Sequence, residues 1–574
     1  MRDRWVVAMA AAAAVGCRYP SAAPRWIGVA AIVVALYRHR PLLLCLAVAT
    51  TASSLSQDAW RGLRAPERYE NYRGTATLVA DPEKVGFVVR AGVRIDGHRY
   101  EATASGSAGA SLFRRLAGEQ VELVGRFTPL GGSNEGWVAS KHYRARLQVE
   151  QVGSWSSGDP LSRAANRLRR ALAQGAASLP ADHRALLSGF VLGDDRTEPP
   201  VLIDEFRASG LSHLTAVSGE NVAFVLAVAA PVLTRLRLRP RLVATIAVVA
   251  FFAFLTRFEP SVMRACAMAG LAAWRTYLAR PASAPRLLAL AVTGLLLVDP
   301  LLVHSVGFGL SVGASAGIIG LSHRIASRLR ALPGPLAEPL AVTLAAQVGV
   351  LPLSLGLFGT VPVVSIPANL LAVPAAGPVM MWGLTGGLAA GTFARPIASL
   401  LHLPTRLAIG WIALVARIAA RLPLGEMGAA HVVVLAAAGA LGWLAARHGR
   451  AFVRSCAIAV TGGVFVAAAL AGRPAPVTAA DVGSGARLWV GGRGETVLAA
   501  ARADPGALAV ALRQRGVHSI DVLVLESPRP LEALTALTER VRVRHVVALQ
   551  PGDAVVVRAG DVRVDVQGTA TPVR

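Results

Sequence analysis

The sequence predicts a polytopic α-helical membrane protein with an inserted extracytoplasmic small β-barrel and a truncated α/β C-terminal domain. The 574-residue chain is 54% hydrophobic and 16% charged, and apolar runs of roughly 15–20 residues, the length that spans a hydrocarbon core, recur along it. Two long polar regions interrupt this pattern. The predicted order is N-terminal transmembrane spans (1–60), the barrel (61–153), amphipathic surface helices (154–211), a transmembrane block (212–471) and the C-terminal domain (476–574).

Residues 1–60 are expected to hold short spans that stay in the membrane. Arg2 and Arg4 precede an apolar stretch, as in a signal peptide, but further apolar stretches follow at 26–37 and 41–56. These further stretches favour membrane spans over a single secretory leader. We therefore expect retained spans.

The region 61–153 has the pattern of short strands. Stretches that alternate apolar and polar residues are separated by Gly, Asp and Asn turns: GTATLVA, GFVVRAGVRI, HRYEATA, QVELVGRF and RARLQVEQV. So many short strands in one small region suggest an OB-like barrel, the oligonucleotide/oligosaccharide-binding type. The fold alone does not establish nucleic-acid binding.

An amphipathic helix is predicted at 161–178. In LSRAANRLRRALAQGAAS, Arg163, Arg167 and Arg170 fall on one helical stripe, with leucines and alanines opposite. This pattern is typical of a helix that lies on a membrane surface.

The main membrane block is expected to cross the bilayer many times. Apolar, helix-length segments lie near 214–234, 242–256, 260–278, 286–298, 301–321, 336–357, 366–393, 406–421, 428–446 and 452–470. Asp204, Glu205 and Asp299 are expected in loops, and His304 at the membrane interface.

Arginine placement predicts the orientation of the chain in the cytoplasmic membrane. The formal net charge is +25, and its excess lies mostly in the membrane part, where Arg-rich loops set topology, so it is weak evidence for nucleic acid. Arginines gather in loops at 235–241, 275–286 and 324–330, and again near 447–454. That side should be cytoplasmic, which places 61–153 and 476–574 outside.

The tail after residue 476 reads as α/β. ARLWVGG and ETVLAAA predict a hairpin, IDVLVLES and RHVVAL predict strands, and PGALAVALRQRG and PLEALTALTERV predict helices. The four cysteines, Cys17, Cys45, Cys266 and Cys456, lie in or beside apolar runs. Neither polar region can therefore hold an internal disulfide or a cysteine-ligated metal.

An ordered set of motifs in the membrane block resembles the ComEC family, the polytopic channel that brings transforming DNA across the bacterial inner membrane. The motifs are ALLSGFVLGDDR (185–196), FRASGLSHLTAVSGENV (206–222), LTRFEPSVMRACAM (255–268), LLLVDPLLVHSVGFGLSVGASAGI (295–318) and LAAQVGVLPLSLGLFGTVPVVSIPANLLAVP (344–374). The resemblance implies a conduit for single-stranded DNA, with the outer barrel receiving the strand.

The resemblance also implies a broken helix beside the transport path at LSHLTAVSGENVAF, which contains His213, Ser218, Glu220 and Asn221. The family pattern places a variable residue and then histidine or asparagine after SG. Glu220 occupies the variable position. Its carboxylate is the departure in this chain, because it would repel phosphate unless an arginine pairs with it. The alternative is that Ser218 N-caps the following span, with Asn221 at its third position.

Two arginines of the third motif are the first choices for phosphate contact, because a polyanion needs cations along its route: Arg257 and Arg264. The alternative is an interfacial pair between Glu259 and Arg264. Gln347 and Asn369 are polar residues in apolar surroundings, where interhelical hydrogen bonding is the common role.

The tail resembles a metallo-β-lactamase-like domain whose metal site is missing. The resemblance implies a His-x-His-x-Asp-His cluster after the strand ending LVL, but Glu526, Ser527, Pro528, Arg529 and Pro530 follow there. His518 and His545 are the tail's only histidines. We expect a degenerate domain with no metal or other cofactor and no nuclease activity.

The leading hypothesis is therefore a DNA translocator that is not an enzyme. No GxxxxGK[ST] loop occurs, so an ATP-dependent motor in the cytoplasm would have to drive transport, and a DNA-receptor protein is expected outside. The alternatives are a membrane-embedded hydrolase that uses Ser218, His213 and Glu220, and a transporter of a small solute or lipid. Assembly into a homo-oligomer is left open by the sequence.

Overall fold

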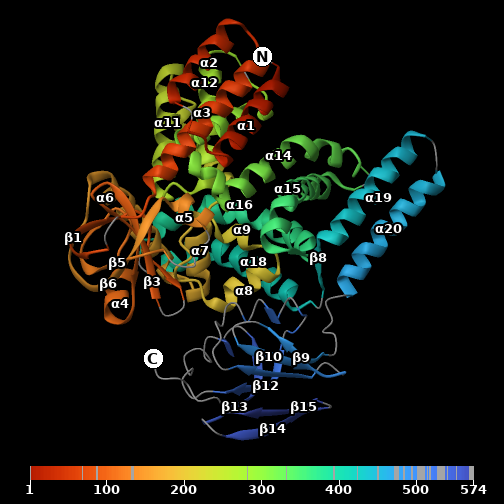
Figure 1. Cartoon of the computed structure of the whole chain (residues 1–574). Coiled ribbons are helices and arrows are strands. Elements are labelled where there is room, and N and C mark those ends of the chain that lie inside the picture. The colour runs from red at the N-terminus through yellow and green to blue at the C-terminus, as the bar shows by residue number, and fades with distance from the viewer. Residues whose placement is uncertain are drawn as a thin grey trace. The chain divides into compact units, whose positions relative to one another are not determined.

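The computed structural model of the chain is mainly helical (Figure 1). It describes residues 2–470 except 23, 67–68, 86–87, 131–134, 281, 331, 392, 394, 423 and 449–450. Of residues 477–567 it describes all except 483–484, 493–494, 501–507, 509–510, 513–514, 516, 518, 527–536, 539–540, 551–552 and 561. The chain forms two compact units. Unit 1 comprises Met1–Thr197, His213–Leu353 and Val373–Gly410, and unit 2 comprises Glu198–Ser212, Ser354–Ala372 and Trp411–Arg574.

The N-terminal helices of unit 1 pack against one another. They are α1 (Asp3–Arg18), α2 (Arg25–Tyr37) and α3 (Pro41–Gly62). A buried apolar cluster joins Ala13, Cys17 and Val48 of α1 and α3 to Leu288 and Leu296 of α13 (Ala284–Val298). Residues far apart in sequence therefore share one core.

The region 61–153 forms the five strands that the sequence predicts and one further short strand, Glu83–Val85. They are β1 (Asn71–Leu78), β2 (Glu83–Val85), β3 (Val88–Ile95), β4 (His98–Ala104), β5 (Gln120–Thr128) and β6 (Tyr143–Ser156), with the short helices α4 (Gly106–Phe113) and α5 (Glu135–Lys141) between them. The sheet order is β1-β5-β6-β4-β3-β2, and β1 also pairs with β3 at two positions. The pair β4–β6 is parallel, and the other pairs are antiparallel.

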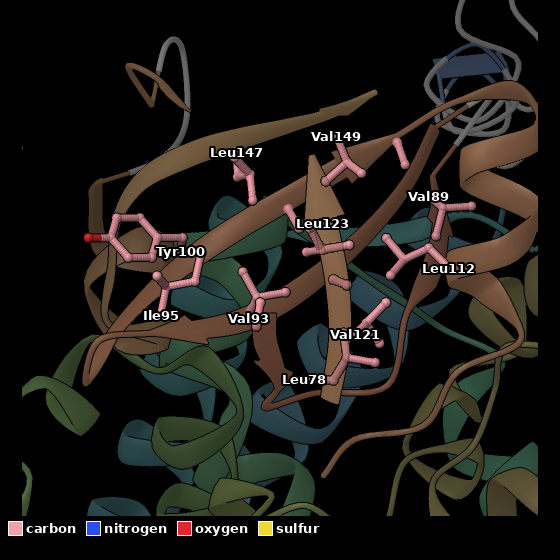
Figure 2. Close-up of a cluster of buried hydrophobic side chains, with 14 of the residues drawn as sticks. Leu78, Val89, Val93, Ile95, Tyr100, Leu112, Val121, Leu123, Leu147 and Val149 are labelled. Atoms are coloured by element: carbon pink, nitrogen blue, oxygen red, sulfur yellow. The ribbon is translucent and has the colours of Figure 1, made fainter. Parts of the chain in front are cut away.

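The core of this β module comes from the alternation of its strands. Leu78, Val93, Leu123 and Leu147 point into one shared interior with Leu112 of α4 (Figure 2). Each is essentially inaccessible to solvent.

The hairpin between β3 and β4 turns at Asp96 and Gly97. Both residues have positive φ, 48° and 79°, as a two-residue turn with φ above zero at both positions requires. This turn fixes the register that pairs Ile95 with His98.

The helices after the β module follow the predicted segments with shifted ends. They are α6 (Pro160–Gly175), the 3-10 turn η1 (Ala176–Ser178), α7 (Ala181–Leu192), α8 (Pro200–Ala208), α9 (Ser212–Thr215), α10 (Gly219–Leu233), α11 (Leu238–Leu255), α12 (Pro260–Tyr277), α13, the 3-10 turn η2 (Pro300–His304), α14 (Val306–Ala326), α15 (Gly334–Phe358), α16 (Ser365–Ala390), α17 (Arg395–Leu401), α18 (Leu403–Arg421), α19 (Ala429–Arg447) and α20 (Ala451–Leu470). The short strands β7 (Thr360–Pro362) and β8 (Glu426–Gly428) pair in unit 2.

Among the described residues, six helices are long and apolar enough to cross a membrane: Pro41–Gly62, Leu238–Leu255, Val306–Ala326, Leu336–Phe358, Ser365–Ala390 and Leu403–Arg421. Shorter apolar helices cover Arg25–Tyr37, Gly219–Leu233, Ala284–Val298 and Ala429–Gly442. These helices fit a polytopic membrane protein.

Two expectations for this block are corrected by the structure. The span expected at 301–321 is present but begins later, because Asp299 caps the 3-10 turn η2 and α14 starts at Val306. Asp204 and Glu205 lie on α8 rather than in a loop. Asp204 is buried, and Glu205 pairs with Arg417 of α18 at 3.4 Å.

The tail of unit 2 contains the predicted hairpin and strands. Its sheet runs in the order β13 (Arg542–Ala548), β12 (Ser519–Leu525), β11 (Thr496–Ala500), β10 (Ala486–Val490), β9 (Val477–Asp481). The pairs β11–β12 and β12–β13 are parallel. The hairpin β14 (Ala554–Ala559) and β15 (Val562–Gln567) packs through Val557 and Val564 against Val497 and Val524 of this sheet. The predicted helices at 505–516 and 530–541 fall mainly outside the described residues.

Candidate functional site

The stretch around Ser218 lies between the short helix α9 and helix α10. Ser218 N-caps α10, because its hydroxyl oxygen accepts from the Glu220 amide at 3.2 Å. The same hydroxyl donates to Oδ1 of Asn221 at 3.0 Å. Asn221 is 2% exposed and donates to the Phe190 carbonyl of α7 at 2.8 Å. The capping interpretation of Ser218 and Asn221 is confirmed.

Arg264 enters this stretch from α12. The residue is 8% exposed. Its Nε donates to the Ser311 hydroxyl of α14 at 2.9 Å, and its Nη1 lies 3.4 Å from the Met268 sulfur. Ser218, Gly219, Arg264 and Ser311, from three helices, are called the Arg264 cluster below.

Packing against Arg264 explains the glycine of the SG motif. A Cβ on Gly219 would lie 2.2 Å from Nη2 of Arg264 and 3.1 Å from the Cβ of Ala265. Only a residue without a side chain lets the guanidinium approach the first turn of α10 this closely.

Arg264 has no carboxylate partner in the described part of the chain. The expected alternative, a pair with Glu259, is not formed there, and neither is a pair between Glu220 and Arg257 or Arg264. A buried cation without an anion is costly. The positive end of the α10 dipole adds to the same local potential, since Gly219 is its first residue. The cluster is therefore electrostatically suited to an anion.

Arg257 lies in a different setting. Its guanidinium binds both carboxylate oxygens of Asp81, at 3.1 and 3.3 Å, and Oδ1 of Asn166 at 2.7 Å. Asp81 also accepts from Arg169 at 2.8 Å, and Arg169 reaches Asp194 at 3.1 Å. Arg196 in turn binds Asp194 at 2.7 Å. We call Asp81, Asn166, Arg169, Asp194, Arg196 and Arg257 the Asp81 cluster.

The backbone at Arg257 is adapted to this contact. Arg257 and Phe258 have φ of 60° and 56°. Their amides donate to the carbonyls of Phe254 and Ala253, which is the Schellman arrangement that ends a helix. Glycine is the usual residue at the first of these positions. An arginine there accepts left-handed backbone strain and gains the contact with Asp81.

Charge balance in the Asp81 cluster shifts its carboxyl groups. Burial by itself would raise the pKa of Asp81, but Arg169, Arg257 and Arg196 outweigh burial and hold that pKa well below its usual range. Burial also opposes ionisation of Asp194, and Arg196 again brings its pKa below the ordinary value. Both carboxylates are therefore ionised at neutral pH, and the cluster ties the β module to α6, α7 and the α11–α12 turn.

The hydrogen bonds and ion pairs given above do not connect the remaining predicted site residues to the Arg264 cluster. His213 lies on α9 and is exposed, Glu220 is exposed on the first turn of α10, and Gln347 is half-buried on α15. Asn369 is buried on α16 and donates to the Ser365 carbonyl of its own helix at 2.7 Å. The proposed hydrolytic set is not assembled as a relay, because Ser218 donates its hydroxyl hydrogen to Asn221.

Sequence reasoning missed most of the Asp81 cluster. A signal for Asp194 and Arg196 exists in LGDDR, a dense charged stretch directly after an apolar helix. Arg169 also departs from the stripe of its helix. Asp81 offers no such signal, because its place in the β1–β2 turn is ordinary for an aspartate.

No metal centre is found in the tail as far as the structure describes it. Among the described residues, no group of three or more His, Cys, Asp or Glu side chains could hold a metal ion. Glu526 accepts from Arg487 at 3.0 Å, and His545 is exposed. His518 and the residues 527–530, on which the expected absence of a metal cluster depends, lie outside the described residues.

Residues 190–450 match the family described as Competence protein. This part of the chain is therefore a competence-family domain. It is 30% identical over 243 residues to ComE operon protein 3 of Bacillus subtilis, a match that covers 41% of this chain and 30% of that protein. It is 30% identical over 277 residues to Competence protein ComA of Neisseria gonorrhoeae, covering 45% of this chain and 39% of that protein.

A third relative of the chain is Uncharacterized protein YcaI of Escherichia coli, 26% identical over 210 residues, or 34% of this chain and 28% of that protein. The matches thus span less than half the length of each of these relatives. No solved structure matches the chain significantly. The matched region contains Arg264 and Arg257, whereas Asp81 and α6 precede it.

Proposed function

We propose that this chain is a conduit through which single-stranded DNA crosses the cytoplasmic membrane during DNA uptake. The competence-family domain and the six candidate membrane spans support this function. Two of the relatives carry competence or the ComE operon in their names. In this proposal the chain moves DNA and is not itself a nuclease.

The observation that carries the proposal is the Arg264 cluster. A passing strand presents one negative charge per nucleotide, and a cation along the route offsets the cost of removing each phosphate from water. Arg264 is a buried guanidinium at a helix break, with no carboxylate partner in the part of the chain that the structure describes. It is poised to exchange a weak hydrogen-bonding environment for a phosphate.

We infer that the β module is OB-like and lies outside the cell membrane, where it receives the strand. Strand order β1-β5-β6-β4-β3 with an additional β1–β3 pairing, and a parallel β4–β6 pair, support an OB-like topology. The arginine-rich loops of the membrane block support the external placement. The α/β tail is proposed to lie on the same side and to be a degenerate metallo-β-lactamase-like domain.

Transport in this proposal needs partners. An ATP-dependent motor in the cytoplasm would pull the strand, and a DNA receptor outside would deliver it. Conversion of duplex to single strand would fall to a separate nuclease.

The test is uptake by Arg264→Ala in a transformable host that lacks its own competence membrane protein. Internalised labelled strand is divided by the amount of the chain in the membrane. We expect a five- to hundredfold fall, because one charge-assisted phosphate contact is worth about 1–3 kcal/mol. Arg264→Lys should retain part of the activity.

The matched control is Arg275→Ala, which removes the same side chain from the last turn of α12. It should leave normalised uptake near the wild-type value. Normal normalised uptake in Arg264→Ala would refute the assignment of this cluster to the DNA path.

A further inference from the structure

Helix α6 presents an exposed arginine face. Arg163, Arg167 and Arg170 are exposed, and their spacing of four and three residues places them on one side of the helix. The opposite side is buried in unit 1, with Ala165, Arg169 and Leu172 inaccessible. A helix that lies on a membrane directs its apolar side into lipid. In α6 that side is covered by protein, so the membrane-surface interpretation of the stripe does not fit.

The arginine face borders a hollow of about 190 Å³. Its lining combines α6 with the edge of the β module: Glu119, Ser157, Arg163, Asn166, Arg167 and Arg170. Three arginines and one glutamate give this lining a net charge of +2 (3 − 1). We call it the α6 hollow.

Two of the three arginines have partners that hold them in place. Arg170 pairs with the buried Glu119 at 2.6 Å, and Arg163 donates from Nη1 to the Gly158 carbonyl at 2.7 Å. Arg167 makes no ion pair within the described residues. The hollow thus combines a fixed rim with positive charge that no carboxylate of the described residues pairs with at Arg167, which suits a phosphate.

An exposed aromatic residue precedes the hollow in the chain. Trp155 is 48% exposed, lies near the end of β6 and comes two residues before Ser157 of the hollow. The Arg115 guanidinium covers one face of the indole, at 4.3 Å from the ring centroid. Positive charge along a groove, with an aromatic ring on which a base can stack, is the chemistry that proteins use for single strands.

We propose that the α6 hollow binds the phosphodiester backbone of single-stranded nucleic acid, with a base stacked on Trp155. This inference rests on the proposed function, because it names where the incoming strand is held before it reaches the membrane block. Arg163 and Arg167 contact phosphates, and Arg170 with Glu119 sets the position of the rim. A flat bilayer surface fits a concave site poorly, which favours a flexible strand over lipid.

The test is binding of a fluorescently labelled 20-nucleotide oligothymidylate to the detergent-purified full chain, followed by anisotropy over a range of salt concentrations. The variant Arg163→Ala/Arg167→Ala removes two phosphate contacts. Each contact to a single strand contributes about −0.7 to the slope of log K against log salt. The slope should therefore become less steep by about 1.4, and affinity in low salt should fall at least tenfold.

Trp155→Ala should weaken binding about fivefold or more without changing the salt slope, and Trp155→Phe should recover most of the loss. The matched control is Arg235→Ala/Arg237→Ala, which removes the same charge from exposed positions between α10 and α11. It should leave affinity and slope close to wild type. Because the arginine side chains are exposed, the thermal unfolding midpoint should not change in either arginine variant.

The inference is overturned if Arg163→Ala/Arg167→Ala binds oligothymidylate with wild-type affinity and slope. It is also overturned if this variant binds oligothymidylate normally but no longer binds phosphatidylglycerol vesicles in a flotation assay, because the hollow would then be a lipid site. The experiments can refute nucleic-acid binding at the α6 hollow and the proposed conduit independently. Normal oligonucleotide binding by the α6 variant, with transport lost in Arg264→Ala, would refute the hollow alone. The reverse pattern would refute the Arg264 path alone.

Discussion

The ion pair between Asp81 and Arg257 allows a prediction of how removal of each partner changes the stability of the fold. Replacing Arg257 with Ala leaves Asp81 with Arg169 at 2.8 Å and the Ala117 amide at 2.7 Å. Replacing Asp81 with Asn leaves the Arg257 guanidinium, 11% exposed, with Asn166 as its remaining described partner. The carboxylate thus keeps partners after one substitution, while an arginine loses its counter-charge after the other.

The two substitutions should therefore differ in cost. Arg257→Ala should lower the free energy of unfolding by about 1–3 kcal/mol, the range for hydrogen bonds lost from a group that stays paired. Asp81→Asn should cost about 3–5 kcal/mol, because it leaves buried positive charge uncompensated. The double variant should lose less free energy of unfolding than the sum of the losses in the two single variants, by about 1–3 kcal/mol.

A third variant separates the side chain of Arg257 from its backbone. Left-handed backbone costs a residue with a Cβ roughly 1–2 kcal/mol, and glycine avoids this cost while losing more chain entropy on folding. Arg257→Gly should therefore be more stable than Arg257→Ala by about 1 kcal/mol. The two variants lack the same guanidinium, so this difference reports the strain at φ of 60°.

The assay is unfolding of the detergent-purified chain by sodium dodecyl sulfate, followed by tryptophan fluorescence. Uptake normalised to membrane abundance is measured in parallel. Because Arg257 is bound to protein groups, its loss should lower the amount of folded chain more than uptake per molecule. Equal costs for Asp81→Asn and Arg257→Ala, or strict additivity, would show that the cluster does not act as a coupled unit. A steep loss of normalised uptake in Arg257→Ala would instead support phosphate contact at Arg257.

Gly219→Ala should displace the Arg264 guanidinium and lower the folded yield, since the new Cβ would lie 2.2 Å from Nη2. Adding Arg264→Ala should restore the folded yield. A yield that stays low in the double variant would show that the alanine disturbs the backbone instead. The folded-state pKa of Asp81 lies below its ordinary value of about 3.9, so the stabilisation is complete above about pH 4 and is lost as pH falls through the folded pKa. Wild-type stability should thus decline more steeply with acid than that of Asp81→Asn, and parallel acid titrations would contradict this. Phosphatase inserted at Gly97 should be active and at Pro240 inactive, and the opposite result would reverse the proposed topology. Fusions at Gly131 and Gly552, which lie outside the described residues, should also be active. The full chain, washed with chelator, should retain no stoichiometric zinc or manganese by elemental analysis, and bound metal would overturn the degenerate-domain proposal.

Local patterns were sufficient to predict most elements of the fold. The stretch HRYEATA forms β4 at His98–Ala104, with the predicted boundaries, because alternation and turn residues both mark its ends. The hairpin β10–β11 was also predicted, and helix α16 begins one residue before its predicted start. Periodicity specifies these elements because burial of one strand face, or of a whole span, is a property of consecutive residues.

Elements at polar–apolar transitions were harder to predict. Apolar residues 301–304 read as the start of a span, but Asp299 and Pro300 favour a capped 3-10 turn there. Asp204 was expected in a loop, since carboxylates are seldom buried, but it lies on α8 and is buried. Its neighbour Glu205 pairs with Arg417 of α18 in unit 2. No pattern of consecutive residues encodes such a neighbour.

The site illustrates the same limit. Arg257 and Arg264 belong to one motif, seven residues apart, and sequence reasoning gave them the same role. Their difference depends on Asp81, which is 176 residues from Arg257 in the chain. A buried arginine beside a carboxylate is already neutralised, so a phosphate would have to compete with that carboxylate to bind it. Arg264 donates to a hydroxyl and lies against a thioether, and no carboxylate among the described residues competes for it. The order in which a polyanion would meet these residues therefore follows from their counter-charges, and Arg264 rather than Arg257 is the cation that a strand could bind without first breaking the fold.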